Sequence, residues 1–90
     1  MLPTNRPPTP PGEMLLEEFL KPLSMTQRSL AERTGLSVQS INLLIRGKRG
    51  VTAETAIRLS RVFDNSPQFW LGLQMDWDLW HAQRKLERTG

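Results

Sequence analysis

The stretch TQRSLAERTGLSVQSINLLIR, residues 26–46, decides the fold, because it reads as two short helices joined by a tight turn. Thr26 can accept a free backbone N–H in the first turn of a helix over 27–34, and Ser37 can do the same for a second helix. Gly35 stands between them, where a helix often ends in a left-handed residue that glycine adopts at little cost. The spacing therefore predicts helix, turn and helix.

The apolar residues of this stretch fall where the two helices must touch. The first helix carries Leu30 and the small Ala31 on its inner face, which lets the second helix cross close by. Leu36 is expected to be a buried plug in the turn, and the inner residues of the second helix are Ile41, Leu44 and Ile45. This is the spacing of a DNA-binding helix-turn-helix.

The alternative is a plain hairpin of two helices inside an all-α core. Gln39, Asn42 and Arg46 favour DNA binding, because they lie on the outer side of the second helix. Their side chains can form hydrogen bonds with base edges or phosphates.

The charge of the chain gathers on the same region. The net charge of the 90 residues is +3, but residues 26–61 hold seven basic and two acidic side chains, a net of +5. The segments before and after each carry a net charge of −1. A polyanion is therefore the expected partner of the central segment.

The composition also argues against several classes of protein. The chain has no cysteine, so a disulfide framework and a cysteine-rich zinc site are excluded. No apolar run approaches the ~20 residues that span a bilayer, and no signal-peptide pattern is present, so we expect a cytoplasmic protein without a membrane partner.

No residue pattern points to catalysis. Asp76, Asp78 and His81 do not converge on one helical face, so we expect no metal site. Glu17 and Glu18 point about 100° apart on a helix and cannot act as one acid–base pair. We therefore expect neither an enzyme nor a cofactor.

Proline and glycine divide the rest of the chain. Residues 1–11 contain five prolines and are expected to form an extended or disordered arm before a domain over 12–88. Gly12 leads into an amphipathic helix that should end before Pro22, since the residue preceding a proline avoids the α region. The apolar face of this helix comprises Leu15, Leu16, Phe19 and Leu20.

A basic turn and a further helix follow the recognition helix. Gly47 and Gly50 flank Lys48 and Arg49, which are expected to bind the sugar–phosphate backbone. Thr52 should cap a helix over 53–63 whose core stripe is Ala56, Leu59, Ser60 and Phe63, with Ile57 and Val62 alongside. Arg58 and Arg61 lie on its other faces, either solvated, in ion pairs or near DNA.

The last helix is expected over 67–85, with Ser66 as its cap and Pro67 at its first position. It carries more large apolar side chains than one face of a small domain can cover, so part of it is expected to form a homodimer contact. Plain packing within the monomer is the alternative. The predicted dimer residues are Phe69, Trp70, Leu73, Trp77 and Trp80.

Several segments together resemble the HigA antitoxins, a branch of the Xre or phage-repressor-like helix-turn-helix proteins. They are PGEML at 11–15 with Glu18-Phe19-Leu20, the motif at 30–48, TAETA at 52–56, and SPQFWLGLQ at 66–74 with Trp77-Asp78-Leu79. The last pattern is rare elsewhere. The resemblance covers roughly residues 10–80.

The resemblance implies a dimeric five-helix protein that represses its own operon and neutralises a HigB-type toxin, which cleaves mRNA on the ribosome. It also implies that Gln27 contacts a phosphate, and that Ser37, Val38, Gln39 and Leu43 occupy recognition-helix positions that face bases. Val38 and Leu43 depart from the polar pattern of the family. They could contact thymine methyl groups, or Val38 could pack inward.

We therefore predict a compact, all-α, lambda-repressor-like domain that binds a palindromic operator as a C2 dimer, with recognition helices roughly 34–36 Å apart. Base readout is assigned to Ser37, Val38, Gln39, Ser40, Asn42 and Leu43. Phosphate contacts are assigned to Gln27, Arg28, Arg46, Lys48 and Arg49. The alternatives are a free-standing Xre-type repressor without a toxin, and a toxin-holding module that binds DNA weakly.

Overall fold

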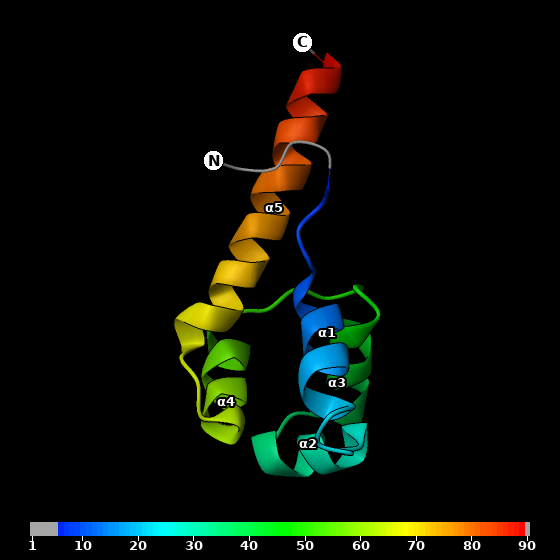
Figure 1. Cartoon of the computed structure of the whole chain (residues 1–90), viewed down its shortest axis with the longest axis vertical. Helices are drawn as coiled ribbons and strands as arrows, with labels where there is room; N and C mark the ends of the chain where they lie inside the picture. The colour runs from blue at the N-terminus through cyan, green and yellow to red at the C-terminus, as the bar shows by residue number, and fades with distance from the viewer. Residues whose placement is uncertain (1–5, 90) are drawn as a thin grey trace.

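A computed structural model describes residues 6–89 of the chain, and all its secondary structure is helical (Figure 1). The first helix is α-helical in α1 and continues directly as the π-helical segment η1, so the segments form the five helices that the sequence predicts. The bounds are α1 Pro11–Met14, η1 Leu15–Leu20, α2 Gln27–Thr34, α3 Val38–Ile45, α4 Ala53–Phe63 and α5 Pro67–Thr89.

Serine and threonine caps set the starts of the later helices. Thr26, Ser37 and Thr52 each accept the backbone N–H three residues later through the side-chain hydroxyl, at 3.0, 3.0 and 3.3 Å. The Ser66 hydroxyl likewise accepts the N–H of Phe69 at 3.1 Å, before α5. These caps were predicted, and the structure confirms them.

The first helix ends at Leu20, before Pro22 as predicted, but it begins earlier than predicted and the conformation expected of Lys21 is wrong. Pro11 begins α1 rather than ending the arm, because a proline at the first helical position needs no N–H and has a suitable φ. Lys21 keeps α-helical angles (φ −63°, ψ −51°), so it does not leave the α region as we expected of the residue before Pro22. Instead the helix has widened: the N–H of Lys21 donates to the carbonyl of Leu16 at 3.0 Å, five residues back. A proline ring collides with the carbonyl four residues earlier in a regular helix, which accounts for the wide turn.

The core lies where all five helices meet. Its fully buried large side chains are Trp70, Leu15, Leu30, Ile41 and Leu59. Leu36, the predicted plug, is half-buried and packs against this core, whereas Ile57 is 41% exposed and does not close it.

Trp70 belongs to the monomer core, and its assignment to a dimer contact is wrong. Its side chain is 0% exposed, and its indole N–H donates to the Asn65 Oδ1 at 3.0 Å. The ring packs against Phe19, Phe63 and Phe69, with centroids 5.0 to 6.1 Å apart. The start of α5 crosses the other helices here, so its inward face is covered within one chain.

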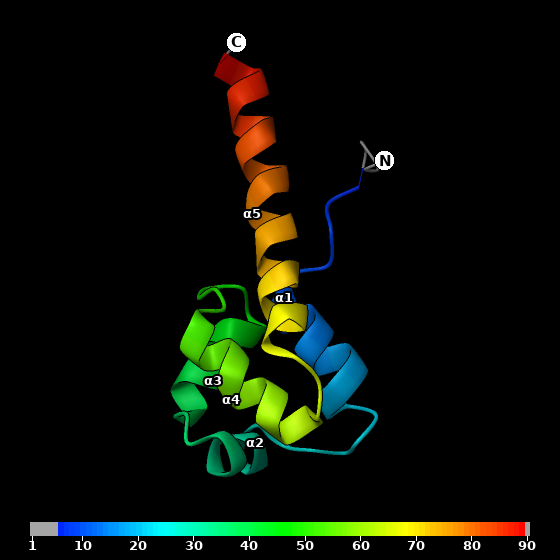
Figure 2. The same ribbon diagram turned by 90° about the vertical axis from the view of Figure 1, so that its left-hand side faces the viewer.

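The remainder of α5 projects from this compact head (Figures 1 and 2). The helix runs to Thr89, past the predicted end at residue 85. The principal extents are 46 × 25 × 22 Å and the radius of gyration is 14.0 Å, against about 12 Å for a compact domain of this length. The helix is not long and apolar enough to cross a membrane, and neither is any other helix in residues 6–89.

The described part of the proline-rich arm, residues 6–10, contains no helix, and Pro10 is extended (φ −69°, ψ 151°). This agrees with the extended arm that the prolines predict. The predicted arm also includes residues 1–5, which lie outside the described residues.

Candidate nucleic-acid interface

The turn between α2 and α3 is held by a short network of hydrogen bonds. Gly35 has φ 80°, the left-handed conformation predicted for it. Next to it, the Thr34 hydroxyl donates to the carbonyl of Leu30 at 2.7 Å and accepts the N–H of Leu36 at 3.1 Å. These bonds fix the direction in which the chain enters α3.

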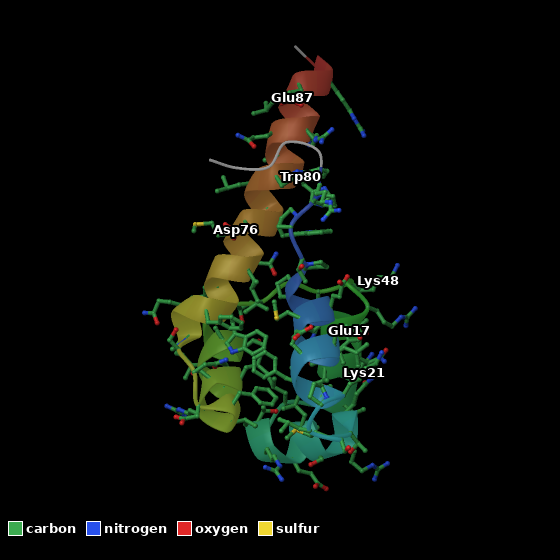
Figure 3. The ribbon with its side chains drawn as sticks, viewed as in Figure 1. Glu17, Lys21, Lys48, Asp76, Trp80 and Glu87 are labelled. Carbon is green, nitrogen blue, oxygen red and sulfur yellow. The ribbon has the colours of Figure 1, made fainter. Side chains whose placement is uncertain are left out.

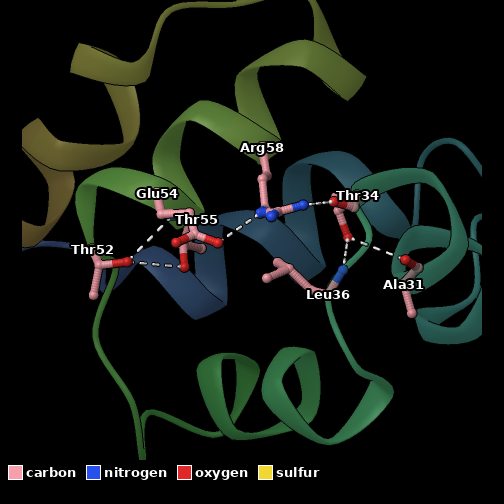
Figure 4. Close-up of polar contacts among 7 residues, drawn as sticks. All are labelled: Ala31, Thr34, Leu36, Thr52, Glu54, Thr55 and Arg58. Atoms are coloured by element: carbon pink, nitrogen blue, oxygen red, sulfur yellow. Dashed lines mark hydrogen bonds and ion pairs between the residues drawn. The ribbon is translucent and has the colours of Figure 1, made fainter.

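Arg58 of α4 clamps the same turn (Figure 4). Its Nη1 donates to the carbonyl of Thr34 at 2.7 Å, and its Nε donates to the Glu54 Oε2 at 3.0 Å. A Cβ at Gly35 would lie 2.8 Å from Nη1, so the guanidinium packs directly on the glycine. Arg58 is therefore paired within the protein. Its four-residue spacing from Glu54 signals the ion pair, but no local pattern signals the bond to Thr34.

The outer face of α3 carries Gln39, Leu43 and Arg46. Residues 39, 43 and 46 are spaced by four and three, so they share one face of the helix. That face is opposite the fully buried Ile41. Gln39 and Arg46 are exposed and Leu43 is half-buried, so this face can meet a surface lying against α3.

Val38, at the first turn of α3, is 44% exposed and does not pack inward. Inward packing, one of the two roles left open for Val38, is therefore wrong. Contact with a thymine methyl group stays a prediction. The Val38 side chain offers an apolar surface only.

Ser37 and Ser40 are less available for base readout than predicted. The Ser37 hydroxyl caps α3 and donates to the Ser40 Oγ at 2.9 Å. The same Ser40 oxygen accepts the Arg49 Nη1 at 2.8 Å. The Ser37 hydroxyl proton is thus already used in a hydrogen bond, whereas the Ser40 hydroxyl can still donate its own.

Asn42 connects the two helices of the motif. Its Nδ2 donates to the Gln27 Oε1 at 3.3 Å. This bond leaves the Gln27 amide N–H groups free to donate, as a phosphate contact requires. Ser40 and Asn42 lie about 200° apart around α3, so Arg49 and Gln27 meet the helix on opposite flanks.

The basic side chains lie around these flanks. Arg28, Arg46, Lys48 and Arg49 are all exposed, and Lys48 points away from the turn beside α3 (Figure 3). The turn begins against α3, where the N–H of Lys48 donates to the carbonyl of Leu43 at 2.8 Å. Of the predicted phosphate residues, Gln27, Arg49 and Lys48 are thus joined to α3 by hydrogen bonds.

A contact that the sequence did not indicate closes the other end of the turn. The N–H of Val51 donates to the Gln74 Oε1 at 2.7 Å, and the Gln74 Nε2 donates to the Asp78 Oδ1 at 2.9 Å. Gln74 belongs to α5, so a residue of the last helix holds the chain that follows Lys48 and Arg49. The only signal for Gln74 in the sequence was its place at the end of the family motif SPQFWLGLQ.

The remaining predicted dimer residues are spaced by four, four and three, so they lie along one face of α5, but their environments differ. Phe69 packs edge-on against Trp70, and Leu73 packs against the core. Trp77 and Trp80 are half-buried and both contact His81, with ring centroids 4.2 and 5.0 Å away. Arg84 lies over the Trp80 ring at 4.4 Å, and Figure 3 shows Asp76, Trp80 and Glu87 marking the course of α5 away from the head.

Known proteins are similar to this chain in sequence and in fold. A family model described as helix-turn-helix matches residues 16–70. An uncharacterised HTH-type transcriptional regulator of Escherichia coli, YbaQ, is 42% identical over 91% of this chain and 73% of its own length. Antitoxin HigA-1 of Vibrio cholerae is 41% identical over 93% of this chain and 79% of its own length.

A solved structure is also similar to this chain. The Pseudomonas aeruginosa antitoxin HigA, determined with the higBA promoter, superposes with a TM-score of 0.86 at 38% identity. The match covers 91% of this chain and 89% of that one.

Proposed function

Because the chain belongs to the HigA-type antitoxins of the Xre-like helix-turn-helix family, we propose that it binds its own operator DNA as a repressor and neutralises a HigB-type, mRNA-cleaving toxin. The observation that carries the DNA-binding part is the surface of α3. Gln39, Leu43 and Arg46 face outward between two flanks on which Gln27 and Arg49 are held by hydrogen bonds. Such a surface can enter the major groove while its flanks meet phosphates.

In this proposal Gln39 is the main base-reading residue. Its exposed amide can pair with the donor and acceptor of adenine, and Leu43 or Val38 can touch a thymine methyl group. Gln27, Arg28, Arg46, Lys48 and Arg49 are assigned to phosphates. The solved HigA relative, determined with its promoter DNA and 38% identical to this chain, supports DNA binding by this fold.

We place the contact between two copies on the projecting part of α5. Met75, Leu79, Ala82 and Leu86 recur at spacings of four, three and four, which aligns them along one face. The three large ones are 55 to 69% exposed. Trp77 and Trp80 lie on a different face of α5 from this stripe. They stay candidates for a contact between copies because they are only half-buried, whereas the fully buried Trp70 does not. A C2 dimer implies a palindromic operator.

The charges beside the stripe favour antiparallel pairing of the two helices. Asp78 and Lys85 are seven residues apart and lie on the same edge of the stripe. In an antiparallel pair the same edges of the two stripes face each other, so each Asp78 can lie near the Lys85 of the other copy. In a parallel pair this edge faces the opposite edge of the partner's stripe instead, so Asp78 and Lys85 do not meet. We therefore propose an antiparallel dimer.

The toxin-binding part rests on the family. A protein that acts on operator DNA works beside the chromosome, so we also propose a cytoplasmic location. A free-standing regulator is the second candidate, because YbaQ, a relative of similar identity, is described as a transcriptional regulator. An adjacent toxin reading frame whose product co-purifies with this chain would favour the antitoxin.

The test is a fluorescence-anisotropy titration of the purified protein against its own upstream DNA and a scrambled duplex, at two salt concentrations. We expect tight, promoter-selective binding that weakens steeply as salt rises. Equal and weak binding to both duplexes would contradict an autorepressor and leave toxin binding as the main activity.

A further inference from the structure

We propose that Gln74 is a positioning residue for DNA binding, which fixes the basic turn Gly47–Gly50 so that Lys48 and Arg49 can reach the DNA backbone. This inference rests on the proposed function, since it assigns those cations to phosphates. It adds a residue on α5, outside the helix-turn-helix, to the DNA-binding machinery.

The first step is that the basic turn is poorly supported by packing. Residues 46–50 are all exposed. A Cβ added at Gly47 would have no atom of the described residues within 4 Å beyond its immediate neighbours. The turn also borders an open trough of about 510 Å³ between α1, α3 and α5. Its backbone position therefore depends on how its two ends are held, with the Arg49 side chain bonded to the Ser40 Oγ between them at 2.8 Å.

The second step is that the two ends are held by different helices. At the first end, the N–H groups of Gly47 and Lys48 donate to the carbonyls of Leu44 and Leu43, at 3.1 and 2.8 Å. At the second end, Val51 has a buried side chain, and its N–H donates to the Gln74 Oε1 at 2.7 Å. The side chain of Val51 anchors the chain, and Gln74 fixes the orientation of the peptide that follows Gly50.

The third step is that the Gln74 amide is itself held in place. Its Nε2 donates to the Asp78 Oδ1 at 2.9 Å, one turn further along α5. A Cβ at Gly50 would lie 3.0 to 3.2 Å from three atoms of the amide, so the amide packs directly against this glycine. The carbonyl oxygen is thus directed at the turn, and Gly50 leaves room for it.

The test combines amide exchange, measured by NMR, with DNA binding. In Gln74→Ala the N–H of Val51 loses its acceptor, so we expect it to exchange at least about tenfold faster. We expect the same variant to bind promoter and scrambled DNA more weakly by a common factor, about tenfold at 0.1 M salt for each phosphate that a basic side chain no longer reaches. The slope of log K against log salt should flatten by about 0.9 for each such phosphate.

Several variants serve as matched controls. Gln83→Ala removes the same type of side chain from the same helix. Gln83 lines a separate pocket beside the arm, so this variant should leave both measurements unchanged. Gly50→Ala forces the Gln74 amide to shift by a few tenths of an ångström, so it should speed exchange at Val51 less than Gln74→Ala does. Asp78→Asn keeps an acceptor for Gln74. The exchanged pair Gln74→Glu with Asp78→Asn restores both hydrogen bonds at unchanged net charge, so it should recover the slow exchange of the Val51 N–H.

A double-mutant cycle separates positioning from general destabilisation. If Gln74 acts through the basic turn, Gln74→Ala should have no further effect on DNA binding when Lys48 and Arg49 are already alanine. An equal loss in that background would overturn the proposal, as would unchanged exchange at Val51 or unchanged DNA affinity. Loss of promoter preference in the native protein would instead contradict the proposed repressor function, and failure to bind any DNA would overturn both.

Discussion

At the scale of single residues, Gln39 and Lys48 are both exposed, and we propose different roles for them in DNA binding. Gln39→Ala removes a base-edge contact from the outer face of α3, so we expect it to relax the choice of one base pair at a cost of about 1–3 kcal/mol. Lys48→Ala removes a cation from the exposed turn, so it should weaken binding to all sequences alike and flatten the salt dependence. Titrations against single-base operator variants check both, and an unchanged base preference in Gln39→Ala would remove that assignment.

Arg58 is expected to act on stability rather than on DNA contacts. Arg58→Ala deletes the bond to the Thr34 carbonyl, while its pair with the exposed Glu54 contributes little. We expect the free energy of unfolding to fall by about 1–2 kcal/mol in urea denaturation. Arg61→Ala, one turn along on the exposed side of α4, is the matched control and should change stability by less than about 0.5 kcal/mol. Equal effects of the two variants would contradict the clamp.

At the scale of helices, α1 and α3 meet backbone to backbone at Gly12. A Cβ there would collide with the carbonyl oxygen of Leu44 and lie 2.8 Å from the Cα of Ile45. We therefore expect Gly12→Ala to destabilise the protein by at least about 2 kcal/mol, since backbone cannot move aside cheaply. A Cβ at Gly72, within α5, would approach no atom of the described residues beyond its own helix. Gly72→Ala should therefore stabilise by about 0.5–1 kcal/mol, and thermal unfolding would show shifts of opposite sign.

The sequence predicted the helices because their signals are local. Thr26, Ser37, Thr52 and Ser66 each begin a helix with a short polar side chain, and the structure shows each of them bonded as a cap. The wide turn before Pro22 escaped prediction, because the proline shows that a helix is disturbed but not whether it ends or widens. The α region of Lys21 shows that here it widens first.

At the scale of the whole molecule, the projecting part of α5 should decide the oligomeric state. Leu79→Glu places a charge in the middle of the exposed stripe, so we expect a dimer to become a monomer in sedimentation or light-scattering measurements. Leu23→Glu is the matched control, since Leu23 is 58% exposed and Leu79 55% exposed, yet Leu23 lies in the turn after η1. A dimer that survives Leu79→Glu would exclude this stripe as the interface.

The sequence could not place contacts between distant segments of the candidate site. The outer side of α3 follows from helical periodicity, so Gln39, Asn42 and Arg46 could be assigned to it in advance, whereas Leu43 was assigned only through the family resemblance. The bonds from Arg58 to Thr34 and from Val51 to Gln74 join residues 24 and 23 positions apart, and they depend on how α4 and α5 pack. Trp70 was misassigned for the same reason, because apolar composition does not show which face of α5 the head covers.

The distribution of tryptophan along α5 makes the molecule its own optical reporter. Trp70 is sealed in the head and bonded to Asn65, whereas Trp77 and Trp80 lie on the projecting segment against His81. Intrinsic fluorescence therefore mixes a signal from the core with a signal from the projecting helix, where we propose the contact between copies. A chain with phenylalanine at 77 and 80 would emit from the core alone, so unfolding could be followed separately from association without an attached dye.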